Sequence, residues 1–419
     1  MTRSLSLTAA DLTKKGRLKV NITSSLEMVP IENASVGISF TGSPDSSLEE
    51  VKTDSSGQTE TIVLPAPPLE YSLTPQEKQP YSEYNISISA PGYESLLISG
   101  TQILPDVTAL QNIALKPLKK DTAYQDIVIG PHTLFGDYPA KIPESEIKPI
   151  DESGEIVLSR VVIPEYIVVH DGAPTDSTAK NYYIRYKDYI KNVASSEIYA
   201  TWPESTIYAN ILCIMSFALN RVYTEWYRNR GYDYTITSST AFDQKWIYGR
   251  NVFDNIDYLV ETVFANYLSR PGIKQPIFTS YCDGKKATCT GLSQWGSKYL
   301  GDEGYNAIDI IRTYYGNDMF INTADAISGV PASYPGYTLT IGSSGQKVLQ
   351  LQEHLNRISK NYPLIPKIDA DGIYGAKTAE AVSVFQKIFS LPITGDTDYT
   401  TWYTISDIFV GVTRIAEPK

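Results

Sequence analysis

Glu197 is the residue of this sequence whose surroundings best suit acid–base chemistry. It closes a predicted helix and precedes a turn that contains Tyr199 and Trp202. The negative end of a helix dipole and apolar neighbours both disfavour a charged carboxylate, so both raise its pKa. A carboxyl group that keeps its proton near neutral pH can act as a general acid. From these residues alone, an exposed surface glutamate without a chemical role is the favoured interpretation.

Histidine and cysteine are too scarce for a histidine-rich metal centre or a disulfide framework. Cys213 lies in an apolar helix and is expected in the core. Cys282 and Cys289 have six residues between them and no third metal ligand in reach. We therefore expect a pair of free or disulfide-linked cysteines there rather than a zinc site. The three histidines, His132, His170 and His354, are far apart in sequence. We expect His170 and His354 to be ordinary surface or packing residues.

Composition and charge exclude several classes of protein. The chain has 419 residues, and its 36 Lys and Arg against 47 Asp and Glu give a net charge of −11. A nucleic-acid-binding protein needs a basic surface instead. The most apolar stretch, residues 207–219, is too short and too polar to cross a bilayer. Residues 1–16 lack the apolar segment of a secretory signal, so we expect the protein to remain where it is made or to leave by an unusual route.

The elements that position these residues fall into three blocks. Alternating apolar residues between about 17 and 117 predict short strands and a small β-sandwich. Residues 119–154 mix Pro, Gly, Glu and Lys without periodicity, which is typical of an exposed, protease-accessible linker. We expect a multidomain α+β protein with four parts: a β-sandwich prodomain at 1–120, a linker with a processing site at 121–154, an α+β domain at 155–330 and a small three-helix module at 336–419.

Helical periodicity is clearest in the second and third blocks. Apolar residues three and four apart predict helices at about 183–196, 204–228, 251–267 and 293–300. Pro203 and Glu204 suit a helix start, where no N–H partner is needed and negative charge meets the dipole.

The most specific motif lies near the C-terminus. It reads Asp-Gly-x-Tyr-Gly-x-x-Thr-x-x-Ala-Val-x-x-Phe-Gln over residues 371–386. Its glycines allow a tight turn, and Thr378 can sit near the start of a helix whose apolar residues pack a three-helix core. This pattern resembles the peptidoglycan-binding domain type 1, and the resemblance implies that the module binds cell-wall peptidoglycan. Near the N-terminus, residues 51–67 and 84–98 resemble a transthyretin-like module, in which no catalytic cluster is visible.

Two stretches of the middle block resemble the SpoIID/LytB domain family. Residues 291–316, GLSQWGSKYLGDEGYNAIDIIRTYYG, contain the Ser-Gln-Trp-Gly core and the terminal Tyr-Tyr-x-Gly-like end of that family. Residues 189–221 resemble the segment around the family's catalytic glutamate, and the two matches occur in the family's order. Carried over residue by residue, the resemblance places the catalytic glutamate at Glu197.

The resemblance implies a lytic transglycosylase that cleaves the MurNAc–GlcNAc bond of peptidoglycan. One glutamate then protonates the glycosidic oxygen and takes the proton of the C6 hydroxyl of muramic acid, leaving a 1,6-anhydro ring. A muramidase that uses water needs a second carboxylate, for which Asp243 is the best candidate. An N-acetylmuramoyl-L-alanine amidase is a weaker alternative because the chain lacks a plausible zinc triad.

Six further residues are expected to contact the substrate: Asp243, Gln244, Tyr248, Ser293, Gln294 and Trp295. Trp295 suits stacking on a sugar face and Gln294 suits bonding to an N-acetyl group, whereas a core tryptophan and a helix cap are the alternatives. Many members of the family bind zinc in a Cys- and His-containing segment. Here Thr237, Phe242 and Asp243 stand where ligands are expected. We therefore predict that the metal site is lost and that no cofactor is bound.

The order of the parts resembles spore cortex-lytic enzymes of the SleC type. That resemblance implies a zymogen stored in the spore, with the β-sandwich as propeptide and a subtilisin-like germination protease cutting the linker around residues 122–130. It also implies cortex peptidoglycan, rich in muramic-δ-lactam, as the substrate. The alternatives are a non-catalytic peptidoglycan-binding spore protein with a degenerate SpoIID-like scaffold, and a wall remodeller that acts during sporulation.

Overall fold

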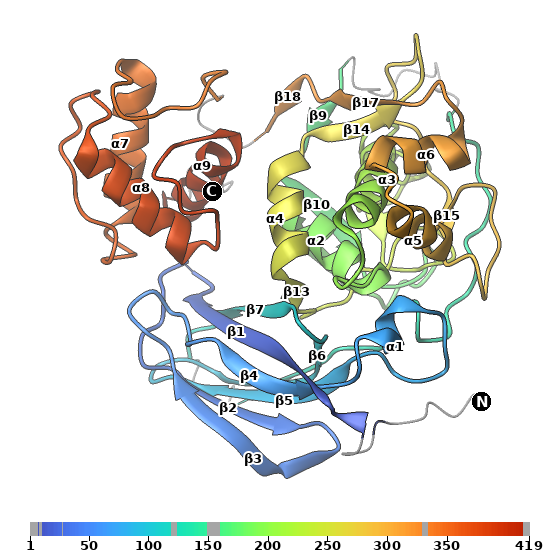
Figure 1. The fold of residues 1–419 in the computed structure, drawn as a ribbon, viewed down its shortest axis with the longest axis horizontal. Coiled ribbons are helices and arrows are strands. Elements are labelled where there is room, and N and C mark those ends of the chain that lie inside the picture. Colours follow the sequence, from blue (N-terminus) through green and yellow to red (C-terminus); the bar gives the residue numbers. More distant parts are fainter. Residues whose placement is uncertain are drawn as a thin grey trace.

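The computed structural model of the chain describes Leu7 and residues 11–26, 28–118, 124–148, 160–328 and 334–413. Its mixed content of 29% helix and 26% strand confirms the α+β class expected of a multidomain chain. In Figure 1 a β-rich part lies beneath a mixed block, and a helical part formed by the C-terminal residues lies beside that block. Among the described residues, every helix is too short or too polar to cross a membrane.

Two sheets form the β-rich part, as the alternation of apolar residues predicts. In the first strand Leu18, Val20 and Ile22 are completely buried, and the residues between them are half-buried. This period of two places one face of the strand against the core. The elements are β1 (Lys14–Ser24), β2 (Ser35–Phe40), β3 (Ser43–Lys52), β4 (Ile62–Ala66), α1 (Glu70–Leu73), β5 (Ser82–Ser89), β6 (Ser95–Ile103) and β7 (Thr108–Leu115).

Strands from later in the chain complete both sheets. β8 (Tyr124–Val128) pairs in parallel with β6, and β13 (Val252–Phe253) pairs antiparallel with β7. Strand orders are therefore β3-β2-β5-β6-β8 and β13-β7-β1-β4. Asn251 adds reciprocal hydrogen bonds with the backbone of Gln102, at 3.0 Å each. The β-rich part is thus joined to the middle block by backbone pairing.

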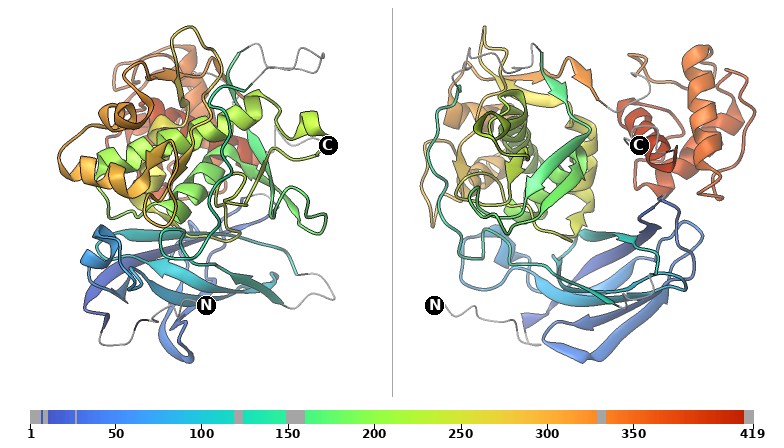
Figure 2. Two further views of the ribbon diagram at one scale, coloured as in Figure 1. Left: turned by 90° about the vertical axis from the view of Figure 1, so that its right-hand side faces the viewer. Right: turned by 180° about the vertical axis from the view of Figure 1, so that it is seen from behind.

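The segment between these parts, which we call the connector (residues 124–148), differs from the exposed linker expected there. Besides β8, it buries His132, Leu134 and Lys148. Its polar groups form hydrogen bonds with the middle block. For example, the backbone N–H of Thr133 donates to the Ser196 carbonyl at 3.0 Å. Figure 2 shows the connector running from the β-rich part along the middle block. Of the processing range expected at 122–130, residues 122 and 123 lie outside the described residues, and 124–128 form a hydrogen-bonded strand rather than an open loop.

Helix α3 forms the centre of the middle block. It is apolar on all sides, and a helix of that kind is buried on all sides. It ends at Tyr223 rather than near residue 228, because Glu225 adopts a positive φ of 47° that breaks the helix. The helices are α2 (Tyr186–Glu197), α3 (Glu204–Tyr223), η2 (Arg228–Arg230), α4 (Asp254–Val263), α5 (Gln294–Asp302) and α6 (Ala307–Tyr315).

Short strands lie at the periphery of these helices. They form a sheet of order β11-β10-β12 and three two-stranded pairs, among the residues that the structure describes. The bounds are β9 (Val162–Ile163), β10 (Tyr166–His170), β11 (Asn181–Arg185), β12 (Ile236–Thr237), β14 (Asn266–Ser269), β15 (Tyr281–Cys282), β16 (Leu292–Ser293), β17 (Phe320–Thr323) and β18 (Ala326–Ile327).

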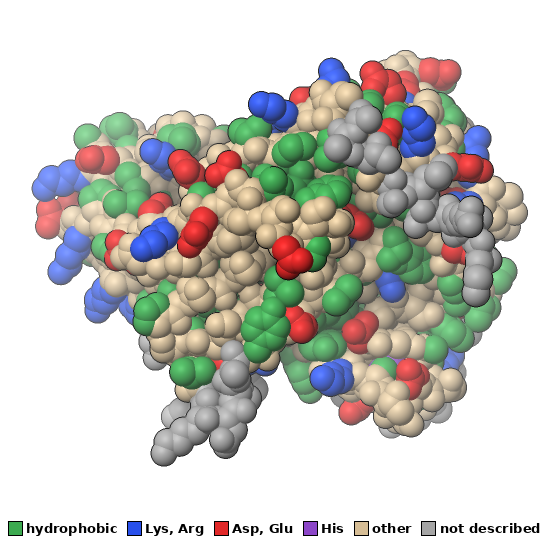
Figure 3. All heavy atoms as spheres, turned by 90° about the horizontal axis from the view of Figure 1, so that it is seen from below, with side chains coloured by type: hydrophobic (Ala, Val, Ile, Leu, Met, Phe, Trp, Pro, Cys, Tyr) green, Lys and Arg blue, Asp and Glu red, His purple; other side chains and the backbone are tan. Residues whose placement is uncertain are grey.

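The C-terminal part contains α7 (Gln346–Ile358), α8 (Ala376–Ile388) and α9 (Tyr399–Thr413). Gln386 holds the turn that follows α8, accepting from the N–H groups of Thr394 and Gly395 at 2.9 Å each. The part also contacts both others, because Gln58 donates to the Ile388 carbonyl at 2.7 Å and Lys187 pairs with Asp407. On the face seen from the β-rich side, acidic and basic side chains are interspersed (Figure 3).

Candidate active site

Glu197 is the last residue of α2, as the sequence predicts, and only 4% of it is exposed. Its Oε1 accepts a hydrogen bond from the backbone N–H of Lys245 at 2.7 Å. Its Oε2 is buried and has no hydrogen-bond partner among the described residues. A buried oxygen without a partner costs free energy, and such oxygens in native proteins mark sites with a role or a missing ligand.

Burial raises the pKa of Glu197 above its ordinary value. The positive charge of Lys141 is the largest influence in the opposite direction, followed by the Lys245 N–H bond and the Tyr281 hydroxyl. Because burial outweighs them, the carboxyl group holds its proton to a higher pH than an exposed glutamate does. This is the protonation state that a general acid needs.

A small cavity of about 80 Å³ lies against Glu197. Its wall in the middle block includes Tyr281 and Gln294, beside the loop that begins at Cys282. The connector forms another part of the wall, with Thr133, Gly136 and residues 138–141. The connector therefore covers the carboxyl group in the intact chain.

Lys141 is the connector residue that reaches deepest toward Glu197. Its Nζ lies 4.6 Å from the ring centre of Phe217 and 4.9 Å from that of Tyr281. It also donates to the backbone carbonyl of Asp243. Burial lowers the pKa of Lys141, while the Glu197 and Asp243 carboxylates act to raise it. Lys141 was not identified from sequence, because nothing in a linker-like stretch marks one lysine as a functional residue.

Gln244 lies behind the cavity rather than in it. It is completely buried, and its Nε2 donates to the Tyr281 hydroxyl at 3.0 Å and to the Ile214 carbonyl at 3.1 Å. Its Oε1 accepts from the Tyr189 hydroxyl at 3.0 Å. Gln244 therefore positions Tyr281, which faces Glu197, instead of contacting substrate as expected. Tyr281 was also not identified from sequence.

Asp243 is not available as a second catalytic carboxylate or a substrate contact, which corrects the expectation. It is completely buried, and its Oδ1 forms an ion pair with Arg221 at 2.7 Å. Its Oδ2 accepts from Tyr227 and from the hydroxyl of Thr237, both at 2.6 Å. Arg221 in turn pairs with Glu144 of the connector at 2.6 Å. Asp243 therefore serves the packing of the middle block.

The three residues of the Ser-Gln-Trp segment have different roles. Ser293 caps α5 by accepting from the Gly296 N–H at 3.0 Å. Gln294 lines the Glu197 cavity, as expected. Trp295 is 3% exposed and packs at 5.0 Å from the ring of Trp202, so it is a core residue rather than a sugar platform.

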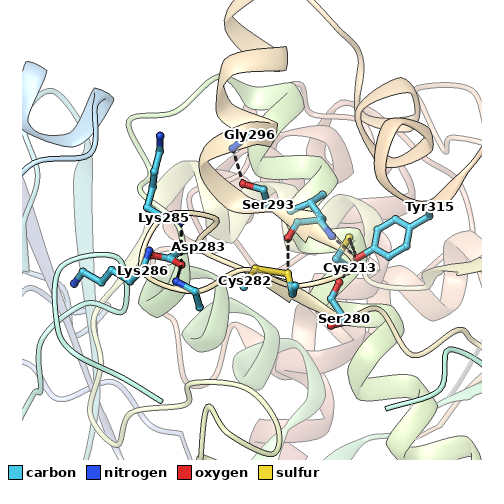
Figure 4. The surroundings of a disulfide bond; sticks show 12 residues. Cys213, Ser280, Cys282, Asp283, Lys285, Lys286, Ser293, Gly296 and Tyr315 are labelled. Atoms are coloured by element: carbon cyan, nitrogen blue, oxygen red, sulfur yellow. Dashed lines mark hydrogen bonds between the residues drawn. A yellow bond between two sulfur atoms is a disulfide. The ribbon is translucent and has the colours of Figure 1, made fainter. Parts of the chain in front are cut away.

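Cys282 and Cys289 form a disulfide at the rim of this cavity. Figure 4 shows Asp283 beside it, where its carboxylate accepts N–H groups of the same loop, including that of Lys286 at 2.8 Å. The Lys286 ammonium donates to the carbonyls of Phe135 and Gly136 in the connector, at 2.8 and 2.6 Å. The disulfide loop therefore holds the connector over Glu197. Cys213 is buried in α3, as expected.

Tyr248 lines a second cavity of about 300 Å³, which lies beside the first. Tyr138 of the connector lines both cavities. Lys245 lines the second cavity with its side chain, and its backbone N–H binds Glu197. Of the six expected substrate contacts, Gln294 and Tyr248 thus lie at a cavity.

Residues 344–405 match the protein family described as "Putative peptidoglycan binding domain". This match supports peptidoglycan as a binding partner of the C-terminal part. A comparison with curated proteins finds no match.

Among solved structures, the SleB N-terminal domain is 26% identical, with 18% of this chain and 99% of that chain covered and a TM-score of 0.16. The Bacillus anthracis TIE protein is 14% identical, with 25% and 17% covered and a TM-score of 0.19. A Klebsiella pneumoniae 5-hydroxyisourate hydrolase is 15% identical, with 24% and 86% covered and a TM-score of 0.17. With TM-scores this low, these likenesses carry no conclusion about function.

Proposed function

We propose that this protein is a lytic transglycosylase that cleaves the glycan strands of spore cortex peptidoglycan during germination. One observation carries the proposal: the buried carboxyl group of Glu197, whose pKa is raised by burial, lies beside a cavity. The SpoIID/LytB resemblance of the surrounding sequence supports the reaction, and the family match at 344–405 supports the substrate.

A single glutamate accounts for the whole reaction. Protonated Glu197 donates its proton to the oxygen between MurNAc and GlcNAc, and the bond from MurNAc C1 to that oxygen breaks. The C6 hydroxyl of the same MurNAc then bonds to C1, and its proton passes to the Glu197 carboxylate. The products are a GlcNAc hydroxyl and a 1,6-anhydro ring, with no water consumed and Glu197 again protonated. Tyr281, held by Gln244, positions the carboxyl group for both steps.

A water-using muramidase is the second candidate, because another carboxylate, Asp283, also lines the Glu197 cavity. Its oxygens accept three backbone N–H groups of the disulfide loop, from Lys285, Lys286 and Ala287. A carboxylate committed to a turn in this way is a poor base or nucleophile. This arrangement favours the single-glutamate reaction.

We further propose that the intact chain is a zymogen. The connector supports this in two ways, since it covers the cavity and since the charge of Lys141 lowers the pKa of Glu197. In this proposal a subtilisin-like germination protease cuts around residues 122–130 and separates the β-rich part, so that the pairing of β8 with β6 no longer anchors the connector and it can move away from Glu197. N-terminal sequencing of the protein from germinated spores tests this step. A protein that is active there but still begins near Met1 contradicts it.

Mass spectrometry of the muropeptides released from cortex sacculi tests the reaction. Anhydro-muramyl ends support a lytic transglycosylase, whereas reducing ends indicate a muramidase and cleaved stem peptides an amidase. Glu197→Gln retains binding to sacculi and releases nothing, while Asp283→Asn retains cleavage. An active Glu197→Gln protein contradicts the assignment, and a processed native protein that binds without cleaving indicates a non-catalytic binding protein.

A further inference from the structure

The segment that follows Gln244 supplies the backbone N–H group that binds the candidate catalytic carboxyl group. Lys245 donates this N–H to Oε1 of Glu197 at 2.7 Å. The Lys245 side chain lines the second cavity instead, with its ammonium 5.0 Å from the ring centre of Tyr138. The direction of the N–H therefore depends on how the backbone of this segment is held.

Asn192 of α2 holds that backbone by a reciprocal pair of hydrogen bonds, which we call the Asn192 clamp. Its Nδ2 donates to the Ile247 carbonyl at 2.8 Å, and its Oδ1 accepts from the Ile247 N–H at 2.9 Å. Asn192 is 8% exposed, so water competes little for these bonds. Because hydrogen bonds are directional, the pair fixes both the position and the orientation of the backbone at Ile247.

Helix α2 therefore holds the segment at two points. Asn192 binds Ile247, and Glu197 at the end of the same helix binds Lys245. Between these points Trp246 is 3% exposed, so its packing sets the depth of the segment in the fold. Apolar packing has no preferred direction, whereas the direction of the Lys245 N–H follows from the Asn192 clamp.

We propose that Asn192 is a positioning residue for Glu197: by holding Ile247 it keeps the Lys245 N–H on Oε1 and so places the acidic proton on Oε2. A carboxylic acid accepts an N–H group on its carbonyl oxygen and carries its proton on the other oxygen. This inference rests on the proposed function, in which that proton passes to the glycosidic oxygen. With the clamp in place, the same oxygen carries the proton in every molecule, which preorganises the acid.

The Lys245 N–H bond also stabilises the ionised form of Glu197. Burial raises the pKa of Glu197, whereas Lys141 of the connector, Lys245 and the Tyr281 hydroxyl act to lower it. The hydroxyl of Tyr189 on α2 stays neutral, because burial and nearby carboxylates raise its pKa well above the ordinary value. Loss of the clamp frees the Lys245 N–H without changing any charge, so the pKa of Glu197 rises.

Nuclear magnetic resonance of the full-length protein tests the clamp. The carbon-13 signal of the Glu197 carboxyl group, assigned with Glu197→Gln, reports its pKa, and the amide signal of Lys245 reports the N–H bond. We expect Asn192→Ala to raise the pKa of Glu197 by about one pH unit and to uncouple the Lys245 amide signal from that titration. Asn192→Ser, whose hydroxyl can form one of the two bonds, gives an intermediate increase and keeps the test open if the alanine variant does not fold.

Asn356→Ala is the matched control. Asn356 of α7 forms the same reciprocal pair with the backbone of Ile368, at 2.8 and 2.9 Å, in the C-terminal part. This variant loses bonds of the same kind and length far from the site, and we expect the titration of Glu197 to be unchanged. In the processed protein, the alkaline limb of the pH–rate profile for muropeptide release moves upward in Asn192→Ala, because the acid stays protonated to a higher pH.

A pKa of Glu197 that neither Asn192 variant raises, or that Asn356→Ala raises equally, overturns the proposal. So does a Lys245 amide signal that still follows the titration in Asn192→Ala. The titration involves no cleavage, so failure of this inference is distinct from failure of the proposed reaction. Muropeptide release by Glu197→Gln overturns the reaction and leaves the titration result as it is.

Discussion

Glu197 combines a buried position, a raised pKa and an unsatisfied oxygen, and each of these weakens the fold. A carboxyl group whose pKa is higher in the folded state binds more protons there than in the unfolded chain. Its contribution to stability is therefore complete below the ordinary value of 4.5 and is lost as pH rises toward the folded pKa. Sites of this kind are retained for chemistry rather than for stability.

The first prediction follows from the upward shift of the Glu197 pKa. Glu197→Gln removes the cost of ionising a buried group, so at pH 7 the variant unfolds about 2–4 °C above the native protein. The difference disappears below pH 4.5, where both side chains are neutral. Thermal unfolding followed by circular dichroism across this pH range measures it. A less stable variant at pH 7 would mean that the carboxylate is a structural ion-pair partner instead.

A second prediction concerns Asp243, which pairs with Arg221 inside the fold. Asp243→Asn leaves a buried guanidinium with one fewer carboxylate and costs about 3–5 kcal/mol of folding free energy. We expect a lower Tm but unchanged cleavage per folded molecule at low temperature. Loss of kcat without loss of stability would instead show that Asp243 takes part in the reaction.

At the scale of elements, the connector has the greatest consequence for the site. Its β8 strand lies on β6, His132 stacks on Tyr199 at 4.4 Å, and Lys141 lies beside Glu197. No local pattern predicts such contacts, because each depends on a partner far away in the sequence. The same holds for β13, two residues long, which exists only because β7 lies alongside it.

The third prediction concerns the effect of the Lys141 charge in the connector on the pKa of Glu197. Lys141→Met removes the largest influence that lowers the pKa of Glu197, so that pKa rises in the uncut chain. A carbon-13 NMR titration of the glutamate carboxyl groups, assigned with Glu197→Gln, measures the change. Lys285→Met is the control, since Lys285 is an exposed lysine of the disulfide loop whose ammonium lies by the Tyr299 ring rather than on the connector. Equal titration of the native protein and Lys141→Met contradicts the assigned role.

At the scale of the whole molecule, buried charges join the middle block to the C-terminal part. Lys187 contacts Glu261 of α4 at 2.6 Å and also Asp407 of α9, and Lys191 contacts Glu261 at 2.6 Å. Burial raises the pKa of Glu261, but the two lysines outweigh it and hold the value at about 2. Glu261 therefore stabilises the packing of α4 against α2 at neutral pH.

The fourth prediction is that the packing of α4 against α2 is acid-sensitive. Because the folded pKa of Glu261 is depressed, its contribution is complete above 4.5 and is lost as pH falls toward 2. Urea unfolding at pH 7 and pH 3 is expected to show this loss in the native protein. Glu261→Gln lowers stability at pH 7 by about 3–5 kcal/mol and flattens the dependence between the two pH values. If the free energy of unfolding of the variant depends on pH as steeply as that of the native protein, other carboxyl groups cause the loss.

The sequence alone determined the elements whose signals are local. The helix that ends at Glu197, the start of α3 after Pro203 and the C-terminal helices follow from side-chain period and capping over a few residues. Glu197 itself was identified because residues 189–221 resemble the segment around the catalytic glutamate of the SpoIID/LytB family. Only the tertiary structure decided that Asp243 is an internal ion-pair partner, that Gln244 stands behind Tyr281 and that Lys141 covers the site. Burial and charge pairing depend on residues 20 to more than 100 positions apart, and spacing along the chain does not encode which of them meet.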